Sequence, residues 1–170
     1  GRSATSSGAP GGGGAVPWTN TKSCHFDGVD DHIAVTAFNF ATAKTVSYWI
    51  KLDSIPSGGV YIFGKGTSYY TYLTANGQTV YIYAGTGPLT GATPLSIGAT
   101  HAITTGSWIH IAIVGDGSTV KLYKDGVERA SGLDRTPQGV NRFGGDDTAR
   151  FVNGKMDEVA YFDSALSAAQ

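Results

Sequence analysis

The sequence contains very little cysteine and comparatively little charge. Cys24 is the only cysteine among the 170 residues, so the chain forms no internal disulfide and depends on packing for its stability. Charged residues make up 15% of the chain, against about 25% in an average soluble domain, and the formal net charge is −1. Because the chain has no cluster of lysine or arginine to attract phosphate groups, we expect no nucleic acid partner.

Long apolar runs and known catalytic motifs are also missing. No apolar stretch approaches the roughly 18 residues of a membrane-spanning helix, so we expect no membrane insertion. The motifs GxSxG and HExxH are absent, as is a glycine-rich phosphate loop in a helical context. The only two glutamates, Glu128 and Glu158, lie in separate segments and do not form an obvious pair of carboxylates across a sugar. These absences predict that the protein is not an enzyme.

The first part of the chain differs in composition from the rest. Residues 1–20 are rich in glycine, serine, alanine and proline, which is typical of a flexible arm or linker. We therefore expect the folded domain to comprise residues 21–170. Trp18 in the arm either packs back onto the domain or is exposed.

The domain itself has the pattern of an all-β protein. Turn signals containing glycine recur at short intervals, and the runs between them are rich in valine, isoleucine, threonine, tyrosine and tryptophan. The predicted strands are 45–52, 60–63, 69–75, 78–84, 108–114, 119–124 and 155–162. Many short strands of this kind indicate a β-sandwich or barrel. The only expected helix is a short one after Asp163, capped by Ser164.

One hairpin can be set in register from the sequence. The two-residue turn Asn76-Gly77 joins two strands rich in tyrosine. It places four tyrosines on one face of the hairpin, with Tyr72 opposite Tyr81 and Tyr70 opposite Tyr83. These four are the candidate ligand-binding residues, because an exposed aromatic face can stack on a sugar or contact a protein. The alternative is that this face points into the core, and the sequence leaves both open.

Six segments in order resemble a known family. They are CHFDGVDDHIAV, TVSYWIKL, YIFGKG, GSWIHIAIVGDGSTVKLYKDGVE, NRFGG and FVNGKMDEVAYFDSALS. Together they resemble the laminin-G-like, concanavalin A-like jelly-roll domains of the lectin/glucanase superfamily, in its non-catalytic branch. The similarity runs from Ser23 to Ser167. The most specific segments are the pair Trp108 and His110 with the following GDG and LYKDG turns, and the closing GKMDEVAYFDSALS.

The resemblance implies a fold and a general function. The fold would be a two-sheet antiparallel β-sandwich, a jelly roll, in which the first strand lies beside the last. Members mostly bind glycans, proteins or cell surfaces, and often hold one structural calcium. Trp49 and Trp108 match core positions of the family, and we expect His110 to be a hydrogen-bonded core histidine.

The stretch FDGVDDHI carries the candidate metal ligands. Calcium takes oxygen ligands from carboxylates and from the carbonyls of glycine-containing turns. If the first and last strands are neighbours, Asp157 can approach Asp30 or Asp31 and complete a calcium site. The alternative is an ordinary turn in which the aspartates bind their own backbone. A second acidic turn, Asp146-Asp147, is an independent candidate.

We therefore expect a non-catalytic binding module that recognises a glycan or a glycan-bearing surface. Its location would be extracellular, at a cell surface or at a virion surface, as part of a larger chain or assembly. The alternative is a structural or decoration domain of a virion or other surface assembly, with a protein partner.

Overall fold

The computed structural model describes residues 22–65, 69–84, 92–135, 139–145 and 150–167, with residues 69, 70, 83 and 84 described by backbone alone. These residues form twelve β-strands and one short 3-10 helix, η1 (Ala99–His101). No helix among them is long and apolar enough to cross a membrane. The predicted arm, residues 1–20, lies outside the described residues.

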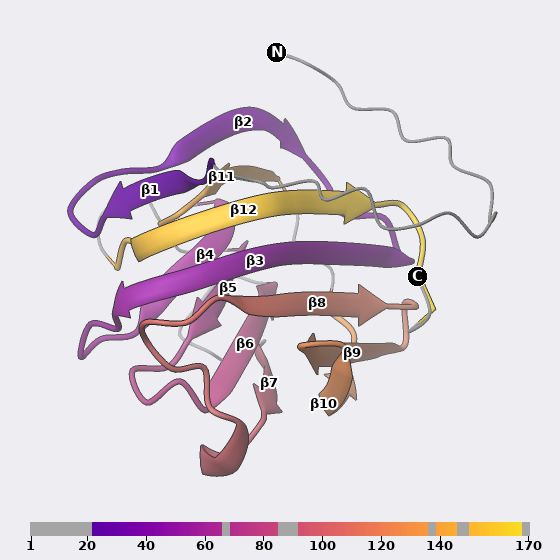
Figure 1. Ribbon diagram of the computed structural model, residues 1–170. Coiled ribbons are helices and arrows are strands. Elements are labelled where there is room, and N and C mark those ends of the chain that lie inside the picture. Colours follow the sequence, from indigo (N-terminus) through magenta and orange to yellow (C-terminus); the bar gives the residue numbers. More distant parts are fainter. Residues whose placement is uncertain (1–21, 66–68, 85–91, 136–138, 146–149, 168–170) are drawn as a thin grey trace, which may run out of the picture.

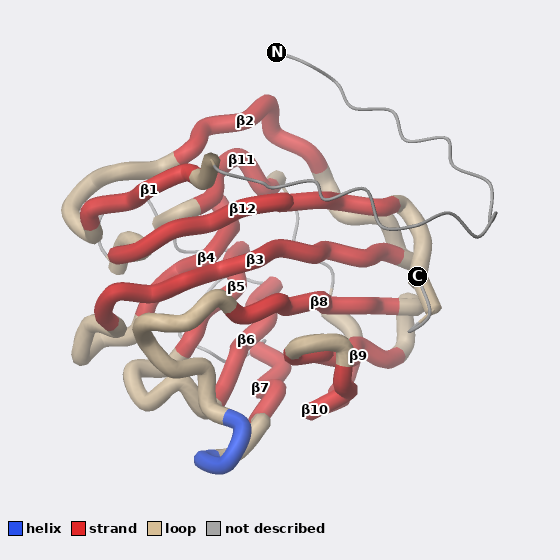
Figure 2. Tube along the Cα trace, viewed as in Figure 1, coloured by secondary structure: helices blue, strands red, loops and turns tan. Residues whose placement is uncertain are grey.

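The strands form two antiparallel sheets of six strands each, packed face to face (Figures 1 and 2). The front sheet consists, in spatial order, of β1 (Cys24–Asp27), β12 (Asn153–Phe162), β3 (Lys44–Ser54), β8 (Ile109–Gly115), β9 (Thr119–Lys124) and β10 (Val127–Leu133). The back sheet consists of β2 (Ile33–Phe38), β11 (Val140–Phe143), β4 (Val60–Lys65), β5 (Tyr69–Leu73), β6 (Thr79–Ala84) and β7 (Ala92–Ser96). The predicted all-β, two-sheet antiparallel sandwich is confirmed, and the first strand does pair with the last.

The core lies between the sheets and follows from side-chain alternation. Because successive residues of a strand point to opposite faces, the isoleucines at 109, 111 and 113 of β8 are buried while the residues between them are partly exposed. In β3 the inward set is Val46, Tyr48, Ile50 and Leu52. Burial raises the pKa of the Tyr48 hydroxyl. The residues that alternate with this inward set therefore form the outer face of the front sheet.

A buried ion pair closes one end of the sandwich. The Lys44 ammonium, at the start of β3, lies 2.7 Å from Asp134 Oδ1 and 2.9 Å from its Oδ2. The side chains are 3% and 0% exposed. The same carboxylate accepts a hydrogen bond from the backbone N–H of Gly117. This carboxylate therefore ties together the start of β3, the turn between β8 and β9, and the end of β10.

Two predictions of secondary structure differ from the structure. Every predicted strand overlaps an observed one, but β1, β2, β7, β10 and β11 were not predicted by range. Four of these five lie at the edges of their sheets. The predicted helix after Asp163 is wrong for the residues described, 163–167. There the Thr45 hydroxyl donates to the Ser164 carbonyl and accepts from the Leu166 N–H, and these two bonds tie the segment to β3 in place of a helix.

Candidate functional site

Two tryptophans are exposed on the outer face of the front sheet. Trp49 of β3 is 37% exposed and Trp108, just before β8, is 39% exposed. Strand pairing places Asp157 of β12 and His110 of β8 on either side of Trp49. The expectation that both tryptophans belong to the core is therefore wrong. Trp49 falls on the outward set of β3, and the inward positions beside it are filled by Tyr48 and Ile50.

His110 links the tryptophan to its neighbours on this face. Its ring centroid lies 5.2 Å from that of Trp49, and its Nε2 lies 2.8 Å from the hydroxyl oxygen of Ser47. Its backbone N–H donates to the carboxylate of Asp125, in the turn between β9 and β10. His110 is therefore hydrogen-bonded, as expected, but it faces the surface and not the core.

The outer face carries two hollows that share one residue. The smaller hollow, of about 250 Å³, is lined by Trp49, Trp108, Asp157 and Glu158. The larger groove, of about 330 Å³, includes Glu158 again in its lining. Its other polar and aromatic lining residues are Thr45, Ser47, His110, Tyr123, Phe162 and Ser167. Because Glu158 borders both, the two form one continuous site across β12, β3, β8 and β9, which we call the tryptophan face.

A β-bulge in β12 shapes this site. The pairing with β3 skips between Asp157 and Ala160, so that two residues of β12 stand opposite one of β3. Glu158 sits in the bulge with a left-handed backbone, φ 48°, and its N–H donates to the Asp157 carboxylate at 2.8 Å. Such a conformation is costly for a non-glycine residue and concentrates at functional sites. Here the bulge places both carboxylates at the hollow beside the tryptophans.

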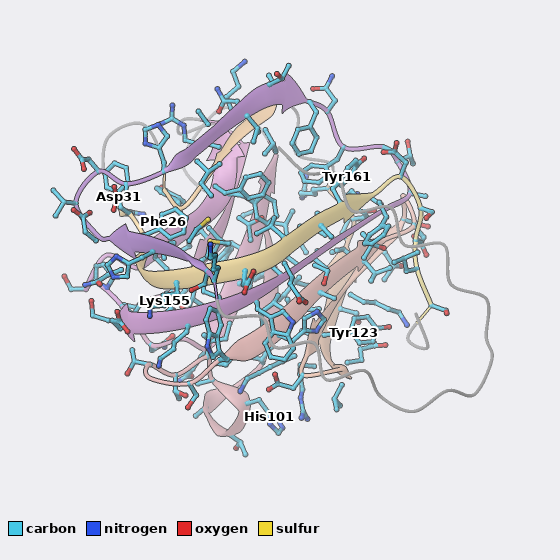
Figure 3. The ribbon with its side chains drawn as sticks, turned by 45° about the horizontal axis from the view of Figure 1, so that its top comes forward. Phe26, Asp31, His101, Tyr123, Lys155 and Tyr161 are labelled. Carbon is cyan, nitrogen blue, oxygen red and sulfur yellow. The ribbon has the colours of Figure 1, made fainter. Side chains whose placement is uncertain are left out.

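The far rim of the groove holds a small polar network. Glu128 Oε2 accepts hydrogen bonds from Lys121 Nζ at 3.0 Å and from the Tyr123 hydroxyl at 3.3 Å. The bond to Glu128 raises the pKa of the Lys121 ammonium. Tyr123 projects from β9 (Figure 3), and the network fixes its ring at the edge of the groove.

The tyrosine hairpin has the predicted register, with Tyr72 opposite Tyr81 and Tyr70 opposite Tyr83. The core-facing set of this hairpin is Thr71, Leu73, Val80 and Ile82, all buried. Tyr72 and Tyr81 therefore lie on the outer face of the back sheet. The side chains of Tyr70 and Tyr83 lie outside the described residues.

The outer tyrosines already have partners within the chain. The Arg150 guanidinium carbon lies 5.3 Å from the centre of the Tyr61 ring and 5.4 Å from that of Tyr72. The Tyr72 hydroxyl donates to the Gly58 carbonyl at 2.7 Å, and burial raises the pKa of this hydroxyl although the charge of Arg150 opposes the rise. A ligand on this face would have to displace Arg150. The outer face of the tyrosine hairpin is therefore a poorer candidate site than the tryptophan face.

The carboxylates of FDGVDDHI come together without Asp157. Ligand oxygens of Asp27, Asp30 and Asp31 lie within 4.8 Å of one another, and Figure 3 shows Asp31 near Phe26 at this end of the front sheet. The residue paired with Asp27 is Asn153, four residues from Asp157 along β12. The expected approach of Asp157 is therefore wrong: it stands beside Trp49. The alternative site at Asp146-Asp147 lies outside the described residues.

Two of these three carboxylates also bind the backbone of their own loop. Asp27 Oδ1 accepts from the Val29 N–H at 2.8 Å, and Asp31 Oδ2 accepts from the Asp27 N–H at 3.0 Å. This is the turn chemistry expected of aspartate. Three exposed carboxylates on a glycine turn are nevertheless the oxygen donors that calcium takes, so the residues present fit such an ion.

Most of the chain matches one known protein family. Residues 27–170 match the concanavalin A-like lectin/glucanases superfamily. The chain belongs to this superfamily. No curated protein matches the sequence at a significant level. The resemblance read from the six segments is confirmed.

Solved structures share the superfamily fold at low identity. Domain 4 of AbnA, a GH43 extracellular arabinanase from Geobacillus stearothermophilus in complex with arabinotriose, is 19% identical with a TM-score of 0.64, covering 89% of this chain and 80% of that one. The CBM40 of the Ruminococcus gnavus IT-sialidase, bound to α2,3-sialyllactose, is 16% identical with a TM-score of 0.60, covering 86% and 92%. A carbohydrate-binding protein from Bacteroides ovatus, so described only provisionally, is 17% identical with a TM-score of 0.64, covering 83% and 44%. At these identities the likeness establishes the fold.

Proposed function

We propose that this superfamily member is a non-catalytic module that binds a glycan on the tryptophan face. The observation that carries the proposal is the hollow in which two exposed indoles, Trp49 and Trp108, stand beside the carboxylates of the β12 bulge. Aromatic faces stack on the C–H surface of a sugar ring, and carboxylates accept hydrogen bonds from its hydroxyls. Domains of the same fold in complex with arabinotriose and with sialyllactose support the proposal.

The arrangement of acids supports binding without catalysis. Glycoside hydrolysis needs two carboxyl groups about 5–10 Å apart on opposite sides of the scissile bond. The two acids at the tryptophan hollow, Asp157 and Glu158, are adjacent in the chain and approach it from the same strand. Glu128, on the other side of the groove, is held by Lys121 and Tyr123. A sugar lying between the tryptophans would therefore meet acids on one side only.

Alanine substitutions of the two tryptophans test the proposal. Trp49→Ala and Trp108→Ala should each weaken glycan binding at least about tenfold, because truncating a tryptophan at a recognition site commonly costs about 2 kcal/mol or more. Binding is first sought on a glycan array that includes arabinotriose and α2,3-sialyllactose, and then measured by titration calorimetry. Melting curves check that the variants fold.

A variant on the opposite sheet provides the matched control. Tyr72→Ala removes an aromatic ring from the outer face of the back sheet and should leave the affinity unchanged. If Tyr72→Ala weakened binding and the tryptophan variants did not, the tyrosine hairpin would be the site. A folded protein that bound no glycan on the array would contradict the proposal and favour the structural or decoration role with a protein partner.

The proposed setting is outside the cell or on its surface, as part of a larger chain or assembly. A glycan-binding module is useful where polysaccharide or glycosylated surfaces are available. The similar AbnA domain belongs to an extracellular enzyme, which supports this setting.

We also propose that one structural calcium binds the loop of Asp27, Asp30 and Asp31. Calcium at a hundred times its dissociation constant should add about 2.7 kcal/mol, which raises the melting temperature of a domain of this size by about 5–10 °C. The double variant Asp30→Asn, Asp31→Asn should lose this rise, whereas Asp157→Asn should keep it. A melting temperature that is the same in calcium and in chelator would contradict the proposal.

A further inference from the structure

The smaller hollow of the tryptophan face combines aromatic rings with negative charge. Its lining consists of two indoles, those of Trp49 and Trp108, and two carboxylates, those of Asp157 and Glu158. Both indoles are exposed to solvent. Among the described residues, no lysine or arginine lines this hollow or the larger groove that adjoins it. The site therefore offers aromatic surface and carboxylates without a cation of its own.

The Glu158 carboxylate is not neutralised by a neighbour. Within the part of the chain that the structure describes, its side chain accepts no hydrogen bond and takes part in no ion pair. The chain's other glutamate, Glu128, has Lys121 as its partner. Glu158 is exposed, and the bulge fixes its backbone at φ 48°, with its N–H donating to the Asp157 carboxylate. The strained bulge therefore holds a free negative charge beside the indoles.

Two lysines of the same face stand outside the hollow. Lys51 follows Trp49 by two residues on β3, and Lys155 precedes Asp157 by two residues on β12, so both face outward with them. The two lysines are paired across the strands, about 7 Å along the sheet from the row of Trp49 and Asp157. Neither lines the hollow. The charge of the face therefore changes sign between the lysine row and the bulge.

The composition of the hollow suits an organic ammonium group. The face of an indole attracts a cation that lies within about 6 Å of the ring centre. A carboxylate attracts the same cation and accepts strong hydrogen bonds from it. An acidic sugar would instead bring its negative charge close to two carboxylates, which repel it. Among glycans, the ammonium group belongs to amino sugars whose nitrogen is not acetylated.

We propose that the tryptophan face binds a glycan containing amino sugars with free ammonium groups. One such sugar lies in the smaller hollow against Trp49 and Trp108, with its ammonium group at Glu158. Because Glu158 also borders the larger groove, the neighbouring sugars of the chain lie there, where the hydroxyls of Ser47 and Tyr123 are available. This inference rests on the proposed glycan-binding function and specifies the class of glycan.

Two sugar trimers test the inference in the full chain. They are the trimers of glucosamine and of N-acetylglucosamine, with the same linkage, compared by titration calorimetry at low salt and at a slightly acidic pH that keeps the amine protonated. The glucosamine trimer should bind about five- to tenfold more tightly, because its ammonium gains a charge pair and contacts with the indoles.

Two variants that each remove one negative charge locate the effect. Glu158→Gln should abolish most of the preference for the glucosamine trimer and leave the affinity for the acetylated trimer unchanged. Asp53→Asn is the matched control, since Asp53 is exposed on β3 and does not line the hollow, and it should keep the preference. A preference that fell equally in both variants would reflect general attraction to an acidic surface and would overturn the inference.

The remaining outcomes separate this inference from the proposed function. Equal binding of the two trimers, or binding of other array glycans but of neither trimer, would overturn the inference and leave glycan binding standing. A folded protein that bound no glycan at all would contradict both. Choline serves as an ammonium probe without a sugar. If choline bound as tightly as the glucosamine trimer, the hollow would recognise a quaternary ammonium and the assignment to amino sugars would be wrong.

Discussion

Replacing Asp134 with alanine is expected to lower the free energy of unfolding by about 3–5 kcal/mol. The substitution leaves the Lys44 ammonium in a site where its side chain is 3% exposed, without the carboxylate that now lies 2.7 Å away. It also removes the acceptor for the backbone N–H of Gly117. Because a domain is commonly stable by only about 5–15 kcal/mol, the variant should unfold at clearly lower urea concentration.

Two comparisons isolate the buried charge as the cause. Glu128→Ala breaks the exposed pair with Lys121, whose side chains are 45% and 42% exposed, and should cost no more than about 1 kcal/mol. The double variant Lys44→Met, Asp134→Leu replaces both charges with apolar groups and should recover most of the loss. Equal destabilisation by Asp134→Ala and Glu128→Ala would contradict this account of the ion pair.

Replacing Phe26 with alanine should cost about 3–5 kcal/mol. Phe26 is the one buried side chain of β1, 2% exposed, and so it anchors a strand of only four residues to the core. Its ring lies so close to the backbone of Gly144 that a Cβ added there would collide with it. Without the ring, β1 and the aspartate loop that follows it lose their anchor in the core and keep only the pairing of β1 with β12. Urea unfolding followed by circular dichroism measures the loss.

A substitution in the same loop provides the control for Phe26. Val29 is 70% exposed, and Val29→Ala should change the stability by less than about 0.5 kcal/mol. Phe26→Leu keeps most of the apolar volume and should cost less than Phe26→Ala. If Phe26→Ala were as stable as Val29→Ala, β1 would be held by its pairing with β12 alone.

Local patterns predicted much of the fold correctly. The register of the hairpin at Asn76-Gly77 was predicted correctly, with Tyr72 opposite Tyr81. The connection is wider than the expected two-residue turn, because the Gly77 N–H donates to the Thr74 carbonyl and the Thr74 N–H donates to the Thr79 carbonyl. Gly77 has the left-handed backbone, φ 69°, that glycine adopts without strain. The runs of β-branched and aromatic residues located seven strands, because strand propensity is a local property. The strands β1, β2 and β11 were not located, since they pair only with strands far away in sequence, and β7 and β10 were also not predicted by range.

The candidate site could not be predicted from the same patterns. Trp49 and Asp157 are 108 positions apart in the sequence and meet only because β3 pairs with β12 in one register. The bulge at Glu158 adds one residue to β12, and no pattern in the sequence indicates where this residue is added. The prediction that Asp157 approaches Asp30 was wrong for a related reason. The sequence predicted that the first and last strands are neighbours, but it did not predict the register, which separates these two residues.

The sequence by itself determined that this chain is a β-sandwich of the concanavalin A-like kind, because alternation, turn glycines and the order of six segments are all local or linear properties. Only the tertiary structure decided which faces are exposed. A strand pattern of period two defines two faces but does not say which one is covered by the other sheet. That depends on packing between distant strands, and it placed Trp49 and Trp108 on the surface, with Leu73 and Ile82 inside and Tyr72 outside.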